Sequence, residues 1–469
     1  MNPISPATQV SPLPPVGTAR PTVAASTHVR YLILATLFLV SAFSYGDRVV
    51  LSIAGIAFAK DLHLKPLQMA YLFSGFSWTY AVAQLPSGWL LDRFGTKRVY
   101  GTAILVWSIL AALAGFAGYL TGAIAFAVIF VLRLLSGLAQ APVFPGNGRV
   151  VAAWFPSTER GTASAIFNCS QYFALVLFAP LMGWLAHTRG WKECFWFLGI
   201  LGVVLTFVWF KVVYDVKSHP SINAQEIATI EDGGGLCVIG TAGNGAANQI
   251  TWKAVGMMLQ NRMLVGIYLG QYCINTLTWF FLTWFPVYLS QARHMSITKA
   301  GVAAALPALC GSAGGVLGGL ASDGLLRSGR SLSFSRKAPI VVGMALAMTM
   351  MLCNVVDKQW QIMVLMSLAF FGKGFGALGW TVVSDTSPKG MVGLNGGMFN
   401  LFGNIAGITT PIVIGYLVQR TGSFRYALIY VGLTALMAIT SYVLITGPIR
   451  RLNPEELGAA PAPSTPATA

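Results

Sequence analysis

Four charged side chains stand deep inside long apolar stretches of this 469-residue sequence: Asp47, Arg48, Arg133 and Lys373. A charge at the centre of a membrane helix costs about 2.5–3.5 kcal/mol on insertion scales, so each of these residues needs a compensating partner. Three cations and one carboxylate leave positive charge uncompensated, and a bound carboxylate would complete the neutralisation. The pattern favours an anionic ligand, because a site for a cation would require an acidic lining.

Arg48 and Arg133 are the candidates for binding that carboxylate. The planar guanidinium pairs with a carboxylate through two hydrogen bonds and keeps its charge at any working pH. The alternative for Arg133 is a structural ion pair with Asp47 on a neighbouring helix. Both roles are compatible if the pair opens when a ligand arrives.

Asp47 is the candidate proton carrier, because opening and closing of its contacts with arginine would change how readily it holds a proton. The alternative is that Asp47 only neutralises Arg48 or Arg133. The five histidines lie in tails, loops or the ends of apolar stretches, where none could relay protons mid-helix; they are His28, His63, His187, His219 and His294.

The composition identifies the elements that must position these charges. The chain is 55% hydrophobic and 9% charged, whereas a soluble domain carries about 25% charged residues. A soluble enzyme is therefore excluded, and no nucleophile–base pair, metal cluster or phosphate-binding loop is visible. The net charge of +16 is first explained by Lys and Arg in cytoplasmic loops of a membrane protein, with no nucleic acid implied.

A membrane-spanning helix needs about 20 mostly apolar residues. The sequence predicts twelve such spans, at 31–56, 68–91, 99–118, 122–145, 161–186, 194–214, 263–290, 299–325, 338–355, 359–385, 391–418 and 425–447. Lys and Arg are more frequent in the inside loops when both termini are placed in the cytoplasm, which predicts that orientation.

The spans are predicted to form two pseudo-symmetric six-helix bundles, at 30–214 and 263–448. A cytoplasmic linker at 215–262 joins them, and disordered cytoplasmic tails occupy 1–29 and 449–469. An internal repeat supports the two halves: Gly88-x-x-x-Asp92 ends the second span, and Gly319-x-x-x-Asp323 ends the eighth. Paired six-helix repeats around a site near the membrane midplane are typical of secondary transporters.

The first of these loops resembles the signature loop of the major facilitator superfamily. Its residues are Gly88, Asp92, Arg93, Gly95, Lys97 and Arg98. The resemblance implies the superfamily's fold and a conformational latch, in which the Asp92 and Asp323 carboxylates and nearby cations hold helix ends together in one state. The alternative is simple cytoplasmic anchoring by the basic residues.

Further stretches resemble the anion:cation symporter family, and within it the permeases for glucarate and galactarate. These stretches are Ser44 to Arg48, Gly137 to Asn147, Ala153 to Pro156, Gly270 to Asn275, Phe281 to Pro286, Phe370 to Trp380 and Met398 to Asn404. The resemblance covers nearly the whole chain outside the tails, and it implies transport of anionic sugar acids.

Neutral side chains of the spans are expected to bind the sugar hydroxyls. The resemblance implies this role for Tyr45, Tyr80, Gln171, Trp380 and Asn400, and Asn275 is added from its place in the seventh span. For each of them, helix packing is the alternative. The aromatic run that contains Trp279 and Trp284 is expected to pack in the core or at a gate.

Gln140 departs from the family pattern, because the relatives usually carry a glutamate there that is regarded as a second protonation site. Glutamine has a similar shape and hydrogen-bonding capacity but does not titrate. Proton coupling through Asp47, Arg133 and Gln140 is therefore expected to be reduced to one proton per substrate, or lost.

Lys373 lies in the second half of the chain, whereas the other three charges lie in the first. It is expected to hold a second carboxylate, so that a six-carbon diacid bridges the halves. The resemblance supports this, since the hexarate permeases carry lysine there and the galactonate permeases carry asparagine. The alternative is a lysine whose amine reaches outward along an apolar stem.

The sequence thus predicts a multi-pass protein of the bacterial inner membrane that imports sugar acids, with glucarate and galactarate as the main candidates. Galactonate, another monocarboxylate or a small organic anion is the alternative. No metal or cofactor is expected besides a coupling proton. The expected partners are the substrate and the lipid bilayer, with no nucleic acid, and the protein is expected to be a monomer.

Overall fold

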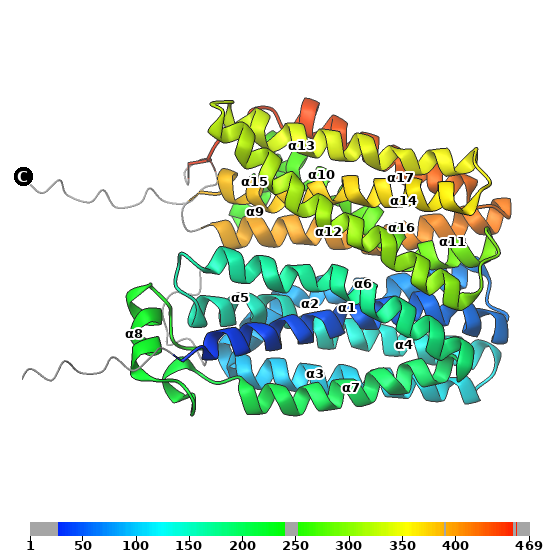
Figure 1. The fold of residues 1–469 in the computed structure, drawn as a ribbon, viewed down its shortest axis with the longest axis horizontal. Helices are drawn as coiled ribbons and strands as arrows, with labels where there is room; N and C mark the ends of the chain where they lie inside the picture. Colours follow the sequence, from blue (N-terminus) through cyan, green and yellow to red (C-terminus); the bar gives the residue numbers. More distant parts are fainter. Residues whose placement is uncertain (1–26, 240–251, 389–390, 454–455, 457–469) are drawn as a thin grey trace, which may run out of the picture.

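The computed structural model describes residues 27–239, 252–388, 391–453 and 456, and all regular structure within them is helical, which confirms the predicted all-α class. Most of the predicted tails and part of the predicted linker fall outside these residues. Figure 1 shows the long helices running side by side, with the start of α1, the short helix α8 and the last described residues at one end of the molecule.

The first part of the chain forms a set of long helices joined by short turns. They are α1 (Val29–Asp61), α2 (Pro66–Phe94), α3 (Thr96–Phe116) with η1 (Ala117–Tyr119), α4 (Gly122–Gln140), α5 (Val143–Trp154), α6 (Arg160–Thr188) and α7 (Trp191–Val212). Two of the turns need glycine, because Gly95 (φ 81°) separates α2 from α3 and Gly190 (φ 101°) precedes α7. Positive φ costs little for glycine, so the chain reverses within one residue.

The described part of the predicted linker is hydrogen-bonded to the first half. It contains η2 (Val216–Ser218) and α8 (Ala224–Asp232), and the segment that follows α8 bonds to the end of α5. The backbone N–H groups of Leu236 and Cys237 donate to the carbonyls of Ala152 and Ala153, at 3.0 and 3.2 Å. Residues 216–239 are therefore anchored to the α1–α7 side. The helix α9 (Trp252–Gln260) follows the undescribed segment.

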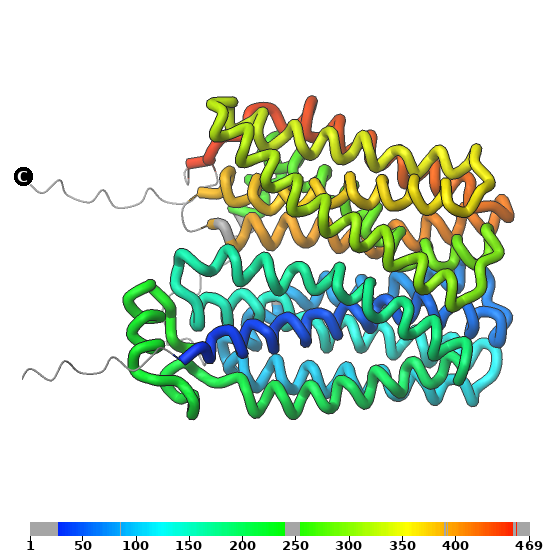
Figure 2. Tube along the Cα trace, in the orientation of Figure 1, coloured from blue at the N-terminus to red at the C-terminus, as the bar shows by residue number. Residues whose placement is uncertain are grey.

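The second part of the chain repeats the arrangement of long helices. It consists of α10 (Arg262–Trp279), the π-helix η3 (Phe280–Trp284), α11 (Phe285–Gln291), α12 (Ile297–Arg327), α13 (Leu332–Ala347), η4 (Met348–Asn354), α14 (Gln359–Gly374), η5 (Phe375–Ala377), α15 (Leu378–Thr386), α16 (Val392–Thr421), α17 (Arg425–Thr440) and the π-helix η6 (Ser441–Ile445). Figure 2 shows these segments, green to red, beside the blue-to-green first half.

Within the described residues, ten helical segments are long and apolar enough to cross a membrane. Two predicted spans are not among the ten, namely α2 and the α10–η3–α11 helix. Both carry polar side chains on buried faces, such as Ser74 and Ser77 on α2 and Gln271 and Thr276 on α10. Polar residues that face the protein interior lower the mean hydropathy of a helix that still has the required length.

The two halves touch closely at one end of the helices. A Cβ built on Gly415 of α16 would collide with the Cβ of Ala70 on α2, and one built on Gly301 of α12 would lie 2.5 Å from the carbonyl oxygen of Ala179 on α6. Only glycine allows backbones to approach this closely. The α2–α16 and α6–α12 contacts are therefore tight at this end.

At the other end, the same helices have open surroundings. No neighbouring atom lies within 4 Å of a Cβ built on Gly88 of α2, Gly319 of α12, or Gly393 and Gly397 of α16. These glycines lie toward the end of the molecule that carries α8. The interface between the halves is therefore closed at the Ala70 end and open at the Gly88 end.

Candidate functional site

Asp47 lies at the centre of a buried hydrogen-bonded group in the first half. Its Oδ2 accepts from Arg133 Nη1 and from Gln140 Nε2, both at 3.0 Å, and the three side chains come from α1 and α4. All three residues are at most 5% exposed. The ion pair given above as the alternative for Arg133 is thus present, and the structure brings together all three residues predicted for proton coupling.

Ser44 fixes the orientation of the Gln140 amide. The Ser44 hydroxyl donates to Gln140 Oε1 at 2.8 Å, so the amide nitrogen faces Asp47. In this arrangement Gln140 is a permanent hydrogen-bond donor to Asp47. A protonated glutamate could donate the same bond, but an ionised glutamate could not.

Arg48 lies in a cage of aromatic rings. Its guanidinium carbon lies 4.5–5.9 Å from the ring centroids of Tyr45, Phe76, Tyr80 and Trp279. Among the described residues it has no carboxylate partner, and its buried Nε has no hydrogen bond. Aromatic faces stabilise a cation by about 0.5–2 kcal/mol each, which leaves the guanidinium edge available for an anion.

A cavity opens beside Arg48, and its walls are mostly polar or aromatic. The lining residues are Ser41, Ser44, Tyr45, Arg48, Tyr80, Val143, Phe144, Asn147, Phe167 and Asn168. The Asn147 amide is held by Ser41 and by the hydroxyl of Tyr100. Of the predicted substrate residues, the structure thus places Tyr45, Arg48 and Tyr80 on one cavity, where a cation and hydroxyl groups could bind a polyhydroxy carboxylate.

Lys373 is buried in the second half, on α14, and is 7% exposed. Its amine lies 5.3 Å from the ring of Phe370 and 5.5 Å from the ring of Tyr172, which belongs to α6 of the first half. No acidic residue within the described chain pairs with it. The side chain therefore does not reach outward to solvent, and it faces the boundary between the halves as an uncompensated cation.

The other predicted substrate residues are not among those that line this cavity. Gln171 donates to the backbone carbonyl of Asn168, and Asn275 donates to that of Gln271, each within its own helix. Asn275 also packs against Gly403 of α16. Trp380, 40% exposed, stacks on Phe144 of the cavity wall with ring centroids 6.3 Å apart.

Asn400 makes a hydrogen bond between the halves. Its Nδ2 donates to Gln84 Oε1 at 3.0 Å, which connects α16 to α2. Asn400 is predicted by a family resemblance, whereas Gln84 is not predicted. Trp279 of the Arg48 cage is likewise expected only to pack in the core or at a gate. Neutral amides and aromatic rings do not stand out in apolar sequence, so no local signal marks these two residues.

The two predicted latch carboxylates, Asp92 and Asp323, make their ion pairs within their own halves. Asp92 pairs with Arg149 of α5, which also contacts the Gly88 carbonyl. The sequence does not predict Arg149, and the neighbouring basic residues have other contacts: the guanidinium of Arg93 lies over Trp89, and the amine of Lys97 lies over Tyr214. For Arg98, the described chain provides no ion pair.

Asp323 has an equivalent contact in the second half. Arg336 of α13 donates to Asp323 Oδ1 at 3.2 Å and to Asp385 Oδ2 at 2.8 Å. The repeat predicted from the sequence thus ends in an acid–arginine pair in both halves. In each case the arginine comes from a different helix, so the acid joins helix ends of the same half.

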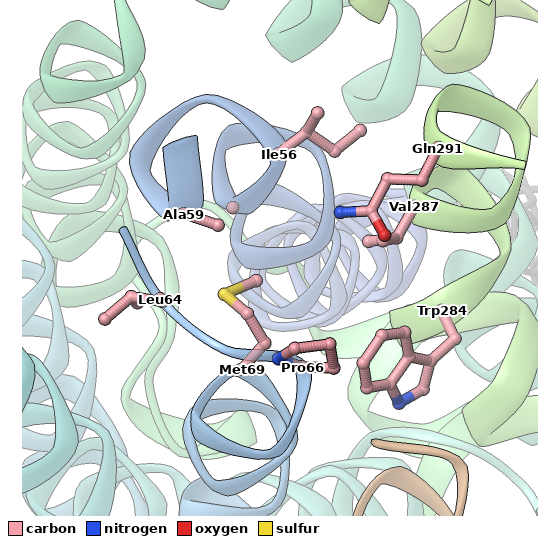
Figure 3. Close-up of a pocket in the computed structure, with 9 residues that line it drawn as sticks. Ile56, Ala59, Leu64, Pro66, Met69, Trp284, Val287 and Gln291 are labelled. Atoms are coloured by element: carbon pink, nitrogen blue, oxygen red, sulfur yellow. The ribbon is translucent and has the colours of Figure 1, made fainter. Parts of the chain in front are cut away.

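A second cavity lies at the closed end of the molecule, between α1, α2 and α11 (Figure 3). Its lining is apolar apart from Gln291 and includes Ile56, Met69 and Trp284. It holds no charged side chain, so it lacks the groups that would bind an anion. Within the described residues, no cluster of three or more His, Cys, Asp or Glu could hold a metal ion.

Solved structures with low sequence identity share this fold. A bacterial homologue of the human lysosomal transporter Spinster, in an inward-facing and occupied conformation, superposes with a TM-score of 0.71 at 14% identity, over 90% of this chain and 98% of that one. A D-xylose–proton symporter superposes with a TM-score of 0.67 at 13% identity, over 90% and 99%.

Closer relatives are found among bacterial transporters. The chain is 56% identical to the "Probable galactarate/D-glucarate transporter GudP" of Bacillus subtilis (strain 168), over 91% of this chain and 94% of the relative. It is 54% identical to the protein of the same name in Escherichia coli (strain K12), over 91% and 95%. A "D-galactonate transporter" of Escherichia coli O6:H1 is 37% identical over 90% and 97%.

These relatives and the ten apolar helices make the chain a multi-pass protein of the bacterial inner membrane. The model described as Major Facilitator Superfamily matches residues 37–408, which is most of the sequence. The chain therefore belongs to the Major Facilitator Superfamily.

Proposed function

We propose that this protein imports the six-carbon dicarboxylates glucarate and galactarate by alternating access of its two halves. The observation that carries the proposal is Arg48, a guanidinium in an aromatic cage beside a polar cavity, without a carboxylate partner among the described residues. A carboxylate would supply the missing partner through two charge-assisted hydrogen bonds.

Lys373 extends the proposal from one carboxylate to two. It is a second buried cation without an acidic partner in the described chain, and it contacts Tyr172 of the opposite half. A diacid could place one carboxylate at Arg48 and the other at Lys373. The names of the 51–56% identical relatives support the same substrates.

Galactonate is the second candidate, because a relative named as a D-galactonate transporter is 37% identical to this chain. A monocarboxylate would engage Arg48 and leave Lys373 uncompensated. The higher identity of the galactarate/D-glucarate relatives and the buried amine both favour the dicarboxylates.

We also propose the full topology, with twelve spans and both termini in the cytoplasm. α2 and the α10–η3–α11 helix add two spans to the ten apolar segments. Both are longer than the roughly 20 residues that a span requires. The spans divide into bundles at 30–214 and 263–448, joined by a cytoplasmic linker at 215–262. In this orientation the open Gly88 end faces the cytoplasm.

Coupling to one proton through Asp47 is the last part of the proposal. Asp47 is the buried carboxylate of the central charged group, and its ion pair with Arg133 would have to loosen when it binds a proton. Gln140 cannot carry a second proton, so we expect fewer protons per substrate than in relatives with a glutamate there.

The test is counterflow in proteoliposomes that contain the purified protein. Radiolabelled glucarate, galactarate, galactonate and gluconate would be compared, each with and without a pH gradient. We expect saturable exchange of the two dicarboxylates and stimulation by an inward proton gradient. Absence of saturable exchange for all four compounds would refute the proposed function.

A further inference from the structure

The contact between α2 and α16 follows a regular spacing along both helices. Ala70, Ser77 and Gln84 lie seven residues apart on α2, so they share one face of the helix. Their partners on α16 run in the opposite direction. Gly415 packs against Ala70, and a Cβ built on Gly407 would lie 2.5 Å from the Ser77 hydroxyl. Asn400 donates a hydrogen bond to Gln84.

The Gln84–Asn400 pair is the last contact of this series. One turn beyond Gln84 lies Gly88, and one or two turns beyond Asn400 lie Gly397 and Gly393. All three glycines have open space where a Cβ would be. The pair therefore marks the point at which the close α2–α16 contact ends.

The pair also lies next to the Arg48 cavity. Gln84 is four residues beyond Tyr80 on the same helix face, and Tyr80 lines that cavity. From the second half, Trp380 stacks on Phe144 of the cavity wall. Gly396 lies one turn before Asn400, and a Cβ built on it would lie 3.4 Å from the Trp380 ring. The pair thus lies beside the cavity, on the helix that supplies Tyr80 to its wall.

Gln84 has one half of its amide unused. Its carbonyl accepts from Asn400, but its Nε2 is buried and makes no hydrogen bond with the described residues. A buried donor without an acceptor is unfavourable. When the cavity is occupied, the hydroxyl and carboxylate oxygens of a sugar acid are the acceptors available to the Gln84 Nε2.

We propose that Gln84 is a substrate-contacting residue that couples occupancy of the cavity to closure of the interface. Its Nε2 donates to an oxygen of the bound polyhydroxy acid while its carbonyl holds Asn400 of the other half. Substrate thereby orders Gln84 and strengthens the last contact of the α2–α16 series. This inference rests on the proposed function, since it requires a sugar acid in the cavity.

The test combines transport with cysteine labelling at the open end. Gly88→Cys reports access to the region one turn beyond Gln84, and maleimide labelling is measured with and without glucarate against the parent protein. Gln84→Met removes the bond to Asn400 and the proposed bond to substrate, with little change in side-chain length. Gln84→Asn keeps the amide but shortens it, and it serves if the methionine variant does not fold.

The matched control is Gln419→Met. Gln419 is also an α16–α2 contact, in which its side-chain oxygen accepts from the Leu67 backbone N–H at 3.1 Å, but it lies at the closed end and is exposed. We expect Gln84→Met to raise the half-saturating glucarate concentration about three- to tenfold. In the Gly88→Cys background, we also expect it to abolish the protection of the introduced thiol by glucarate, whereas Gln419→Met leaves both unchanged.

Two outcomes would overturn the inference: an unchanged half-saturating concentration in Gln84→Met, or glucarate protection of the introduced thiol that persists in it. Failure of the proposed function gives a different result, because the unmodified protein would then exchange none of the sugar acids.

Discussion

Lys373 gives the most specific expectation, because its role separates diacids from monoacids. The change is Lys373→Asn, which removes the charge and leaves a neutral amide. Lys373 has no acidic partner among the described residues. Its replacement therefore does not deprive any described buried carboxylate of a cation, and folding should be retained. Arg133 differs in this respect, since its removal would leave Asp47 unpaired.

The size of the effect follows from the interaction that is lost. A hydrogen bond to a charged group contributes about 1.5–3 kcal/mol, which corresponds to about 10- to 150-fold in affinity. Glucarate and galactarate should lose this amount, because one carboxylate no longer meets a cation. Galactonate and gluconate have a single carboxylate, which engages Arg48, so their apparent affinity should change less than about threefold.

The assay is counterflow in proteoliposomes, with half-saturating concentrations measured for glucarate and gluconate in the same preparation. The quantity of interest is the ratio of the two values, which is independent of the amount of active protein. Lys358→Asn is the matched control, since Lys358 precedes the same helix and is exposed. Equal loss of both substrates in Lys373→Asn, or an unchanged ratio, would refute the bridging role.

Three further predictions follow from the site and its supports. Gln140→Glu would set two carboxylates about 3.0 Å apart, where like charges repel by about 5.5 kcal/mol at an effective dielectric constant of 20. The pair should therefore bind a proton, and the dependence of uptake on pH should become steeper. An unchanged pH profile would contradict this. Arg48→Lys should lower glucarate uptake more than tenfold while the protein stays monodisperse, because an ammonium lacks the planar fork that pairs with a carboxylate; uptake at the native level would argue against carboxylate binding there. Glu226→Ala should destabilise the protein by about 1–2 kcal/mol in thermal unfolding, since Glu226 accepts the Val29 and Arg30 N–H groups at the start of α1, whereas the exposed Glu231→Ala should have no effect.

The long helices and the buried charges could be predicted from the sequence because each has a local signal. Every predicted span contains a helix in the structure, since about 20 apolar residues can satisfy their backbone groups in a membrane only as a helix. Asp47 and Arg133 stand out because charges are rare in such stretches. Their pairing is the alternative interpretation of Arg133, and it is the geometry observed.

The partners of these residues could not be predicted, because they depend on how distant helices pack. Arg149 pairs with Asp92 across 57 positions, and Gln84 pairs with Asn400 across 316. The basic residues next to Asp92 are the nearer candidates in sequence. Along a helix, however, residues one or two positions apart point in different directions, so neighbours in sequence are seldom partners in space.

The helices that carry the site are also the hardest to identify by hydropathy. α2 and α10 are absent from the ten apolar segments, and they supply Tyr80, Gln84 and Trp279. A helix that lines a polar cavity must carry polar side chains on one face. The same property that makes it functional lowers its mean hydropathy below that of its neighbours.

The charges of the site explain why the substrate should be a dianion. Asp47 and Arg133 neutralise each other, and the Gln140 donor holds Asp47 in place without adding charge. Arg48 and Lys373 remain, and both are surrounded by aromatic rings, which compensate a cation only in part. A monoanion would leave one of the two uncompensated in a medium of low dielectric constant, where charge is most costly. A diacid neutralises both, provided that the two halves of the protein close on it together. Discrimination between diacids and monoacids and closure of the transporter would then depend on the same two contacts.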